Sequence, residues 1–388
     1  MSIQYEKSAR IRLSIVAFAF FMATMLIQTD DSSVGTIVAF LCLSSMILFA
    51  LVENGGNLRI SRISVSLLLF LLLVCVVTIA KTTQSFRLPR LILQVIACLF
   101  MLTIEKVNRR EEVFLIGVYI ISTTVYSALL LFSILSPGAK THGNILFLGT
   151  SFDPNFIGLP FAFASALELY FLINRKHRPL VFLGLLISYF ASAFIVILSA
   201  SRGSAFSFVL SNLTVLFLYL TRKNKSALKK AFVLTVVLIA GALMVFFFQE
   251  KFSNAFARII TIGQRGSDNG RFELWQKGFD TWKENWLFGG GFFANYQRFG
   301  RAVHNTYIEV LSETGILGVA LLCPNVFRAV KKCLLINRYM FGALVALLIQ
   351  IVFLDALDNR VLWVVFCWTA VLPEQKDAKE QAVVADYP

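Results

Sequence analysis

Charged residues are scarce in this sequence. Asp, Glu, Lys and Arg make up 15% of its 388 residues, whereas roughly 25% is usual for a soluble domain. Hydrophobic residues account for 57% of the chain, and the mean hydropathy is +0.75. This composition excludes an ordinary soluble protein and predicts an integral membrane protein.

Paired cysteines and metal-ligand patterns are missing as well. The six cysteines lie mostly inside apolar runs, and none forms a CxxC pair. No DxD pair lies in a loop predicted to face outward, and no His and carboxylate cluster has ligand spacing. We therefore expect no disulfide framework, no metal site and no cofactor.

Long apolar runs dominate the chain. A membrane-spanning helix needs roughly 17–25 apolar residues, and about twelve runs approach that length. We expect an all-α polytopic membrane protein with about 12 transmembrane helices. The first helix is predicted to stay uncleaved, because QTDDSS rather than a small-residue cleavage site ends its run. The predicted spans are residues 11–28, 36–52, 63–80, 88–104, 113–135, 156–173, 180–198, 205–220, 231–248, 307–327, 339–355 and 359–372.

The distribution of Lys and Arg predicts the orientation. With the N-terminus inside, the basic clusters fall in inner segments, as the positive-inside rule requires. This explains the net charge of +14 without nucleic acid as a partner. Residues 1–248 then hold helices 1–9, residues 307–372 hold helices 10–12, and residues 373–388 form a cytoplasmic tail. The inner clusters are Lys7/Arg10/Arg12, Arg59/Arg62, Lys106/Arg109/Arg110, Arg175/Lys176/Arg178, Arg222/Lys223/Lys225/Lys229/Lys230 and Arg328/Lys331/Lys332/Arg338.

Residues 249–306 are the one long polar interval, and they are predicted to face outward as a cap. Within this interval, GGGFF at 289–293 lacks the Lys-Ser/Thr of a phosphate-binding loop and predicts a turn. Five aromatic residues recur at spacings of three, four, three and four, which is one face of a helix. Such a helix suits the membrane interface or a position packed on the transmembrane helices, and both interpretations stay open. The aromatic residues are Phe272, Trp275, Phe279, Trp282 and Trp286.

Three residues on the outer side are candidates for chemistry. Arg271 follows the flexible stretch GSDNG, opens the aromatic helix, and carries a guanidinium that suits phosphate oxygens; Arg265 is a weaker candidate. Arg202, in SASRGSAF, lies at the outer membrane boundary, where a charge is costly and usually functional. His304 precedes a membrane span, and its imidazole suits a general base. A snorkelling arginine and a structural histidine are the alternatives.

One outer loop breaks the charge rule. KTTQSFRLPR at 81–90 places Lys81, Arg87 and Arg90 outside. We expect these cations to contact an anionic ligand at the outer leaflet; the alternative is one tolerated exception to the rule. Asp153 and Asn155 lie at the entrance to a span, where helix capping is the favoured interpretation.

Several of these stretches resemble one known family. They are SRGSAF around Arg202, GRFELWQKGF with Arg271, the GGGF turn, HNTYIEVLSETGILG from His304, and DPNFIG at 153–158. Together with their order, they resemble the bacterial O-antigen ligase and O-polysaccharide polymerase superfamily, and the histidine motif is similar to the ligase pattern.

The resemblance implies a metal-independent, inverting glycosyltransferase of the bacterial inner membrane, with its active site facing the periplasm where the cap meets the transmembrane helices. Its donor would be a glycan on undecaprenyl diphosphate. A ligase would transfer the glycan to lipid A-core, and a polymerase to a second lipid-linked glycan. By motif match, His304 would deprotonate the acceptor, while Arg202 and Arg271 would hold the diphosphate. Arg265 and Asn305 are expected to contact substrate, and membrane lipids are further partners.

Two other function classes compete with this interpretation. A lipid-linked glycan transporter would suit the span count, with Glu168 as a coupling residue, but the halves show no clear repeat. Glu168 is also predicted near the cytoplasmic end of its span, where snorkelling is cheap. A structural membrane subunit would leave Arg202, Arg271 and His304 unexplained.

Overall fold

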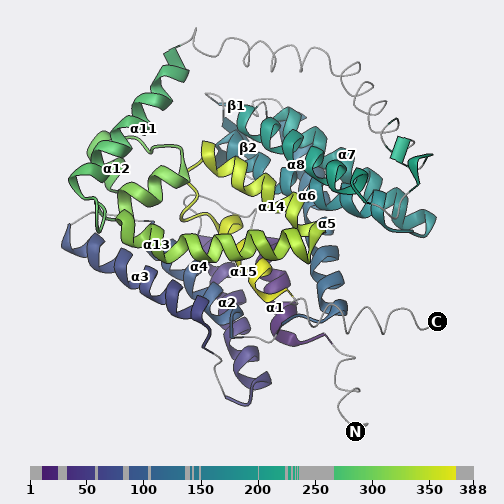
Figure 1. Cartoon of the computed structure of the whole chain (residues 1–388), viewed down its shortest axis with the longest axis horizontal. Helices are drawn as coiled ribbons and strands as arrows, with labels where there is room; N and C mark the ends of the chain where they lie inside the picture. Colours follow the sequence, from purple (N-terminus) through teal and green to yellow (C-terminus); the bar gives the residue numbers. More distant parts are fainter. Residues whose placement is uncertain are drawn as a thin grey trace. The chain divides into compact units, whose positions relative to one another are not determined.

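The computed structural model of the chain describes most of the predicted spans. The described residues are 11–24, 33–56, 60–81, 87–103, 106–135, 140–141, 144–147, 150–199, 201–222, 226–228, 230–231, 233, 235 and 266–372. Helices dominate this part of the chain (Figure 1). They are α1 (Leu13–Ala23), α2 (Ser33–Glu53), α3 (Arg62–Ala80), α4 (Leu88–Met101), α5 (Arg109–Leu135), α6 (Pro154–Asn174), α7 (Pro179–Leu198), α8 (Arg202–Leu220), α11 (Gly266–Glu284), α12 (Ala294–Phe299), α13 (Thr306–Leu335), α14 (Arg338–Gln350), the 3-10 helix η3 (Ile351–Phe353) and α15 (Arg360–Val371).

The chain divides into two compact units that interleave along the sequence. Unit 1 contains Met1–Tyr119, Leu274–Asn337 and Asp355–Pro388. Unit 2 contains Ile120–Glu273 and Arg338–Leu354. Helices α5 and α11 therefore each contribute residues to both units.

Unit 1 packs α3 against α13 and α15 against α4 and α13 (Figure 1). Polar bonds join α3 to α13: Ser66 Oγ donates to the Leu321 carbonyl at 2.6 Å, and Asn325 Nδ2 donates to Ser66 Oγ at 3.1 Å. The fully buried Trp368 ring lies 5.7 Å from that of Tyr119. Between membrane helices such rings stabilise the unit through van der Waals packing, because lipid is as apolar as the protein interior.

Unit 2 packs α6, α8 and α14 closely together, with α7 beside α6. Small residues permit the close approach, as is common between membrane helices. A Cβ on Gly158 would lie 2.0 Å from Ser204 Oγ, and one on Gly342 would lie 2.3 Å from a methyl of Val215. Ser207 Oγ also donates to the Ala346 carbonyl at 2.6 Å, which ties α8 to α14.

The structure supports a polytopic membrane protein but not the full count of twelve spans. Among the described residues, six helices are long and apolar enough to cross a membrane: α3, α5 over Arg109–Phe132, α6, α7, α8 and α13. Five more apolar helices are shorter, at 10–17 residues. The predicted span 231–248 lies almost wholly outside the described residues. The length of an apolar run overestimates the length of a helix where the end of the run forms a turn. The predicted span 339–355 is an example, because α14 ends at Gln350.

Three local expectations differ from the structure. The loop predicted at 136–155 contains an antiparallel sheet of β1 (Lys140–Thr141), β2 (Asn144–Phe147) and β3 (Thr150–Phe152), in the order β1-β2-β3. Its Ile, Phe and Thr residues favour strands. The stretch 266–270, predicted to be flexible, belongs to α11, whose first turn holds Ser267 and Asp268.

The third difference concerns Glu168, which does not snorkel. The residue is fully buried in α6, and the Ser188 hydroxyl of α7 donates a short hydrogen bond to Glu168 Oε1. Ser192 Oγ lies 3.5 Å from the same oxygen. Packing of α7 and α8 on α6 encloses this position, and two serines of α7 are the hydrogen-bond partners of Glu168 Oε1.

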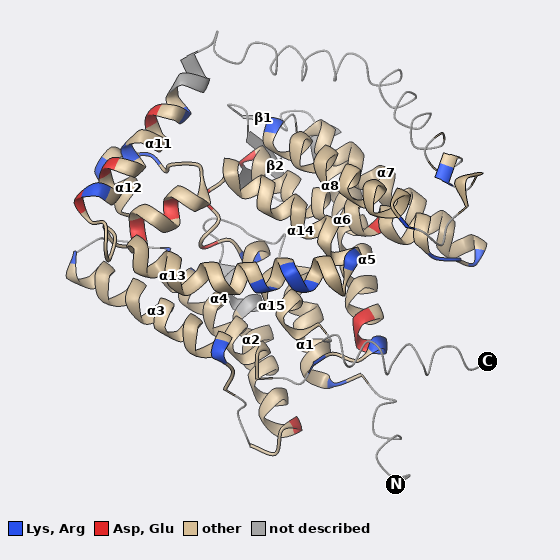
Figure 2. Cartoon of the chain, viewed as in Figure 1, with Lys and Arg blue, Asp and Glu red and all other residues tan. Residues whose placement is uncertain are grey.

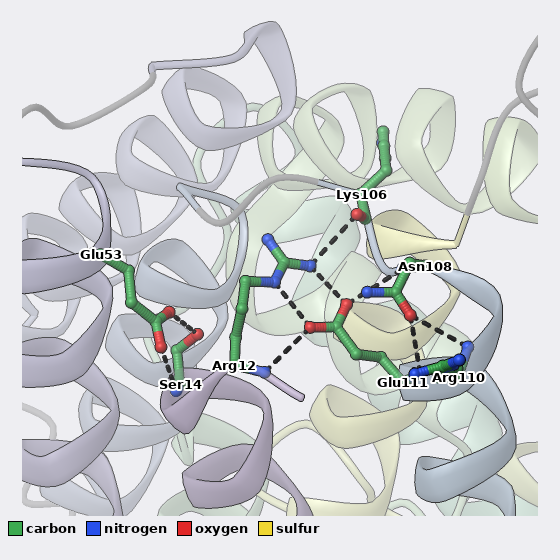
Figure 3. A network of polar contacts seen from close by, with 7 residues as sticks. All are labelled: Arg12, Ser14, Glu53, Lys106, Asn108, Arg110 and Glu111. Carbon is green, nitrogen blue, oxygen red and sulfur yellow. Dashed lines mark hydrogen bonds and ion pairs between the residues drawn. The ribbon is translucent and has the colours of Figure 1, made fainter. Parts of the chain in front are cut away.

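A second buried carboxyl group anchors the start of unit 1 (Figure 3). Glu111 is fully buried, and it accepts from Arg12 Nε at 2.7 Å, from Arg12 Nη2 at 2.7 Å and from the Arg12 amide at 3.1 Å. The Asn108 amide donates at 3.0 Å to Glu111 Oε2, the oxygen that also accepts from Arg12 Nη2, and Asn108 Oδ1 caps α5. We call Arg12, Asn108 and Glu111 the Arg12 network.

Candidate functional site

His304 is held by a carboxylate that lies 51 residues further along the chain. Its backbone amide donates to Asp355 Oδ2 at 2.9 Å, and its ring Nδ1 lies 3.3 Å from the same oxygen. The ring is 41% exposed, whereas the Asp355 side chain is 9% exposed. A carboxylate that accepts from Nδ1–H fixes the tautomer in which Nε2 carries the lone pair. The pair is therefore arranged as a base and its orienting acid.

The backbone at His304 is unusual for a residue with a Cβ. Its φ of 54° lies in the left-handed region, which costs a non-glycine residue roughly 1–3 kcal/mol unless its surroundings impose it. In this conformation the His304 amide donates its hydrogen bond to Asp355. Such local strain clusters at functional sites.

The start of α13 is bonded to the turn that carries Asp355. Asn305 caps α13 by accepting from the amides of Tyr307 and Ile308, and it is 6% exposed. Thr306 Oγ1 accepts from the Ala356 amide at 2.9 Å, and Glu309 Oε2 accepts from the Leu357 amide at 3.2 Å. These bonds position His304 and Asp355 together. The side chain of Asn305, expected to contact substrate, serves the helix as its cap.

The glycine turn interlocks with a break in α13. Gly315 has φ 65° and ψ −170°, so the helix is interrupted there. Ile316 donates its amide to the Trp286 carbonyl at 3.0 Å instead of to its own helix, and the released Ser312 carbonyl accepts from Gly290 at 2.9 Å. A Cβ on Gly315 would lie 2.3 Å from the Leu287 oxygen. GGGFF is thus a turn, as predicted, and it fastens the cap to α13.

The cations of the predicted outer loop 81–90 meet a buried acid. Arg87 Nε lies 3.9 Å from Asp358 Oδ2, and Arg90 Nη1 lies 3.6 Å from it. Burial raises the pKa of Asp358, while the charges of Arg87 and Arg90 oppose that rise. Gln94 Nε2 donates to the Asp358 carbonyl at 2.7 Å. We call His304, Asp355, Asp358, Arg87 and Arg90 the His304 cluster.

The remaining loop cation, Lys81, contacts the cap. Its Nζ donates to Asn285 Oδ1 at 2.9 Å. Phe293, at the end of the glycine turn, lies under the Arg87 guanidinium, with 5.4 Å from the Arg87 Cζ to the ring centroid. Cap and loop therefore share polar and cation–π contacts.

Arg202 begins α8 in unit 2, at the short junction that the sequence predicts. Helix α7 ends at Leu198, and the Ser201 hydroxyl caps α8 by accepting from the Ser204 amide. Ser201 Oγ also donates to Asn155 Oδ1, while Asp153 caps α6, as predicted. The start of α6 and the cap of α8 are thus bonded to each other, and Arg202 is the first residue of α8 after this cap.

Arg271 lies in the part of α11 that belongs to unit 2, and it is partly exposed. The aromatic stripe behind it is largely open: Phe272 is 66%, Phe279 37% and Trp286 55% exposed. The buried side of α11 carries Leu274 and Thr281 instead. A Cβ on Gly278, between them, would lie 2.5 Å from Ile308 in α13. Of the two open interpretations, the exposed stripe favours a helix at a membrane interface.

The structure brings some predicted residues together and leaves others apart or undescribed. His304, Asn305, Lys81, Arg87 and Arg90 all belong to unit 1, whereas Arg202 and Arg271 belong to unit 2. Arg265 lies outside the described residues.

Asp355 and Asp358 were missed by sequence reasoning. Both are acids in FLDALDNR, between two apolar runs. The argument that flagged Arg202, a costly charge at the membrane boundary, applies equally to them. Among the described residues, no group of three His, Cys, Asp or Glu side chains has an arrangement that could hold a metal ion.

Comparison with known proteins gives one result. A protein-family model described as O-antigen ligase matches residues 187–323, and no curated protein matches the chain. The matched segment contains Arg202, Arg271 and His304 but ends before Asp355. This chain therefore carries a domain of the O-antigen ligase family over residues 187–323.

Proposed function

We propose that this protein is an O-antigen ligase of the bacterial inner membrane. It transfers a glycan from undecaprenyl diphosphate to a sugar hydroxyl of lipid A-core at the periplasmic face. The family domain supports a membrane glycosyltransferase that uses lipid-linked glycans. The single observation that carries the chemistry is the contact between His304 Nδ1 and Asp355 Oδ2.

The proposed step is one displacement at the anomeric carbon. The acceptor hydroxyl oxygen attacks this carbon, the bond to the diphosphate oxygen breaks, and undecaprenyl diphosphate leaves with the electron pair. His304 Nε2 takes the hydroxyl proton, and Asp355 stabilises the imidazolium that forms. Attack opposite the leaving group inverts the configuration.

Arginines fit the leaving group in this proposal. Negative charge grows on the diphosphate as the sugar–oxygen bond breaks. A guanidinium held in place stabilises this charge, and it is positively charged at any relevant pH. We assign this role to Arg202 and Arg271 because the family motifs carry both. The position of Arg202 supports its role further. It is the first residue of α8, whose cap, Ser201, is hydrogen-bonded to Asn155 in α6.

The test uses purified full-length protein with a glycan on undecaprenyl diphosphate and lipid A-core as acceptor. We expect transfer by the wild type and about 10²–10⁴-fold less by His304→Ala, the range for loss of a general base. His177→Ala is the matched control, because His177 contacts the Phe171 carbonyl at the end of α6. Full activity of His304→Ala would show that the base is another group.

Varying the acceptor separates the ligase from its closest competitor. Chain extension on a second lipid-linked glycan, with no transfer to lipid A-core, would identify a polymerase instead. Movement of the intact donor across vesicle membranes without cleavage would identify a transporter, and both findings would overturn the ligase proposal.

A further inference from the structure

A cavity of about 380 Å³ opens within unit 1, away from the His304 cluster. It lies between α13 and α15 and is bordered by Ile63, the second residue of α3. Four of its lining residues are cationic: Lys106, Arg328, Lys331 and Lys332. None of the described residues that line it is acidic.

Two of these cations are fixed at the cavity by the end of α15. Lys106 Nζ donates to the Ala370 carbonyl at 2.7 Å, and Lys332 Nζ donates to the same carbonyl at 3.1 Å. Lys332 also bonds the Leu372 carbonyl. Carbonyls at a helix C-terminus attract ammonium groups, so they hold two like charges side by side.

The Arg12 network reinforces this position. The carbonyl of Lys106 accepts from Arg12 Nη2 at 3.1 Å (Figure 3). The Val107 amide, next in the chain, donates to the Val371 carbonyl at 3.0 Å. The backbone that carries Lys106 is therefore bound both to Arg12, just before α1, and to α15. The other two cations of the cavity, Arg328 and Lys331, are exposed on the surface of α13.

The cavity has an apolar wall as well as its charges. Leu335, Ile336 and Phe366 line it together with Ile63. Figure 2 shows the acidic positions of α13 near its start and the basic positions in its later part. The same basic cluster is one of those that the positive-inside rule assigns to the cytoplasm. Charge and apolar surface thus meet at the predicted inner boundary of the membrane.

We propose that this cavity binds the headgroup of an anionic phospholipid of the inner leaflet. The phosphate would lie among Lys106, Arg328, Lys331 and Lys332, and the acyl chains would leave along the apolar wall. Basic pockets between membrane helices on the cytoplasmic side recognise such headgroups. A volume of this size also falls in the usual range of about 300–1,000 Å³ for small-molecule sites. Free phosphate would use the cations but not the wall.

The test measures phosphatidylglycerol bound to the purified full chain by native mass spectrometry. The variant Arg328→Gln/Lys331→Gln removes the two exposed cations and keeps the two that bond α15. We expect its affinity for phosphatidylglycerol to fall about ten- to thirtyfold, since each basic residue near a headgroup contributes modestly and the contributions add. Phosphatidylcholine should bind the wild type at least tenfold more weakly than phosphatidylglycerol.

The matched control is Lys176→Gln/Arg178→Gln. It removes one Lys and one Arg that are exposed and also predicted to be cytoplasmic, but that do not line the cavity. Equal loss in both variants would reduce the effect to net charge and overturn the site. Displacement of the lipid by millimolar inorganic phosphate would overturn the lipid as the occupant. Glycan transfer is not measured, so the result is independent of the proposed function.

Discussion

The Arg12 network and the His304 cluster each place a basic side chain beside a buried carboxylate. They differ in how many oxygens of that carboxylate accept hydrogen bonds. Both oxygens of Glu111 accept hydrogen bonds from Arg12 or Asn108. Asp355 uses only Oδ2, and its buried Oδ1 has no hydrogen-bond partner among the described residues. His304 in turn remains 41% exposed.

We expect this difference to separate a structural contact from the proposed catalytic one. A saturated, buried pair resists rearrangement, and losing one partner leaves an uncompensated charge. Within the part of the chain that the structure describes, Asp355 has one oxygen without a hydrogen bond, and it lies beside a strained, exposed histidine. Such a histidine is accessible to accept a proton from a substrate. Changes in the Arg12 network should therefore affect stability, and changes in the His304 cluster should affect rate.

The largest expected effect is on rate, from Asp355→Asn. The amide can present its NH2 group to Nδ1 and stabilise the wrong tautomer, as in the serine protease triad, so kcat should fall about 10³–10⁴-fold. KM for the lipid-linked donor should stay nearly constant, because Asp355 orients the base and does not bind the donor. Asp280→Asn, an exposed acid of α11, is the control. A rise in KM at unchanged kcat would contradict a positioning role.

The next effect is on stability, from Arg12→Ala. It strands the buried Glu111 carboxylate and should lower the free energy of unfolding by about 3–5 kcal/mol. Thermal unfolding in detergent measures this, with the exposed Arg62→Ala as control. Arg12→Ala/Glu111→Gln should recover part of the loss. A normal transfer rate per folded molecule is expected, and a rate defect without destabilisation would reverse the comparison.

Sequence patterns predicted local features of both units well. Apolar run length predicted the helices, and the short SASRGSAF junction predicted the neighbouring ends of α7 and α8 at Leu198 and Arg202. Asp153 was confirmed as a cap and GGGFF as a turn. These features depend on residues close in sequence, where propensity and capping chemistry decide the outcome.

Features that depend on distant partners were not predicted. Asp355 lies beside His304 across 51 residues of sequence, and Asp358, the acid near Arg87 and Arg90, also comes from a distant part of the sequence. Periodicity identified a face of α11, but Leu274 and Thr281, not the aromatic stripe, are its buried side. A repeating pattern gives the period of a helix, and only its packing partner decides which side is covered.

A smaller effect should come from Gly315→Ala, which tests how the cap supports the His304 cluster. The new Cβ would meet the Leu287 oxygen at 2.3 Å while φ is 65°. We expect a loss of about 2–3 kcal/mol from strain and forced displacement. Gly300→Ala has a similar φ of 66° with open space around its Cβ, so it should cost only about 1 kcal/mol. Equal losses in thermal unfolding would mean that the interlock between turn and helix adds nothing.

The smallest effect concerns pH and Asp358. Burial holds its pKa above the ordinary value of a carboxyl group, although Arg87 and Arg90 oppose the shift. A raised pKa means that the folded protein binds the proton more tightly than the unfolded chain. Its contribution to stability is therefore complete below the unfolded pKa and is lost as pH rises through the folded pKa.

Asp358→Asn should remove the loss of stability that accompanies rising pH. Arg87→Gln should raise the pKa of Asp358 further, so that the loss continues to higher pH. Glu111→Gln serves as the contrasting variant from the Arg12 network, because it removes an acid whose charged form is fully bonded. Thermal unfolding between about pH 4 and 8 measures all three. If Asp358→Asn leaves the curve unchanged, the carboxyl group ionises in the folded protein as it does in the unfolded chain, and it faces Arg87 and Arg90 as an ordinary carboxylate.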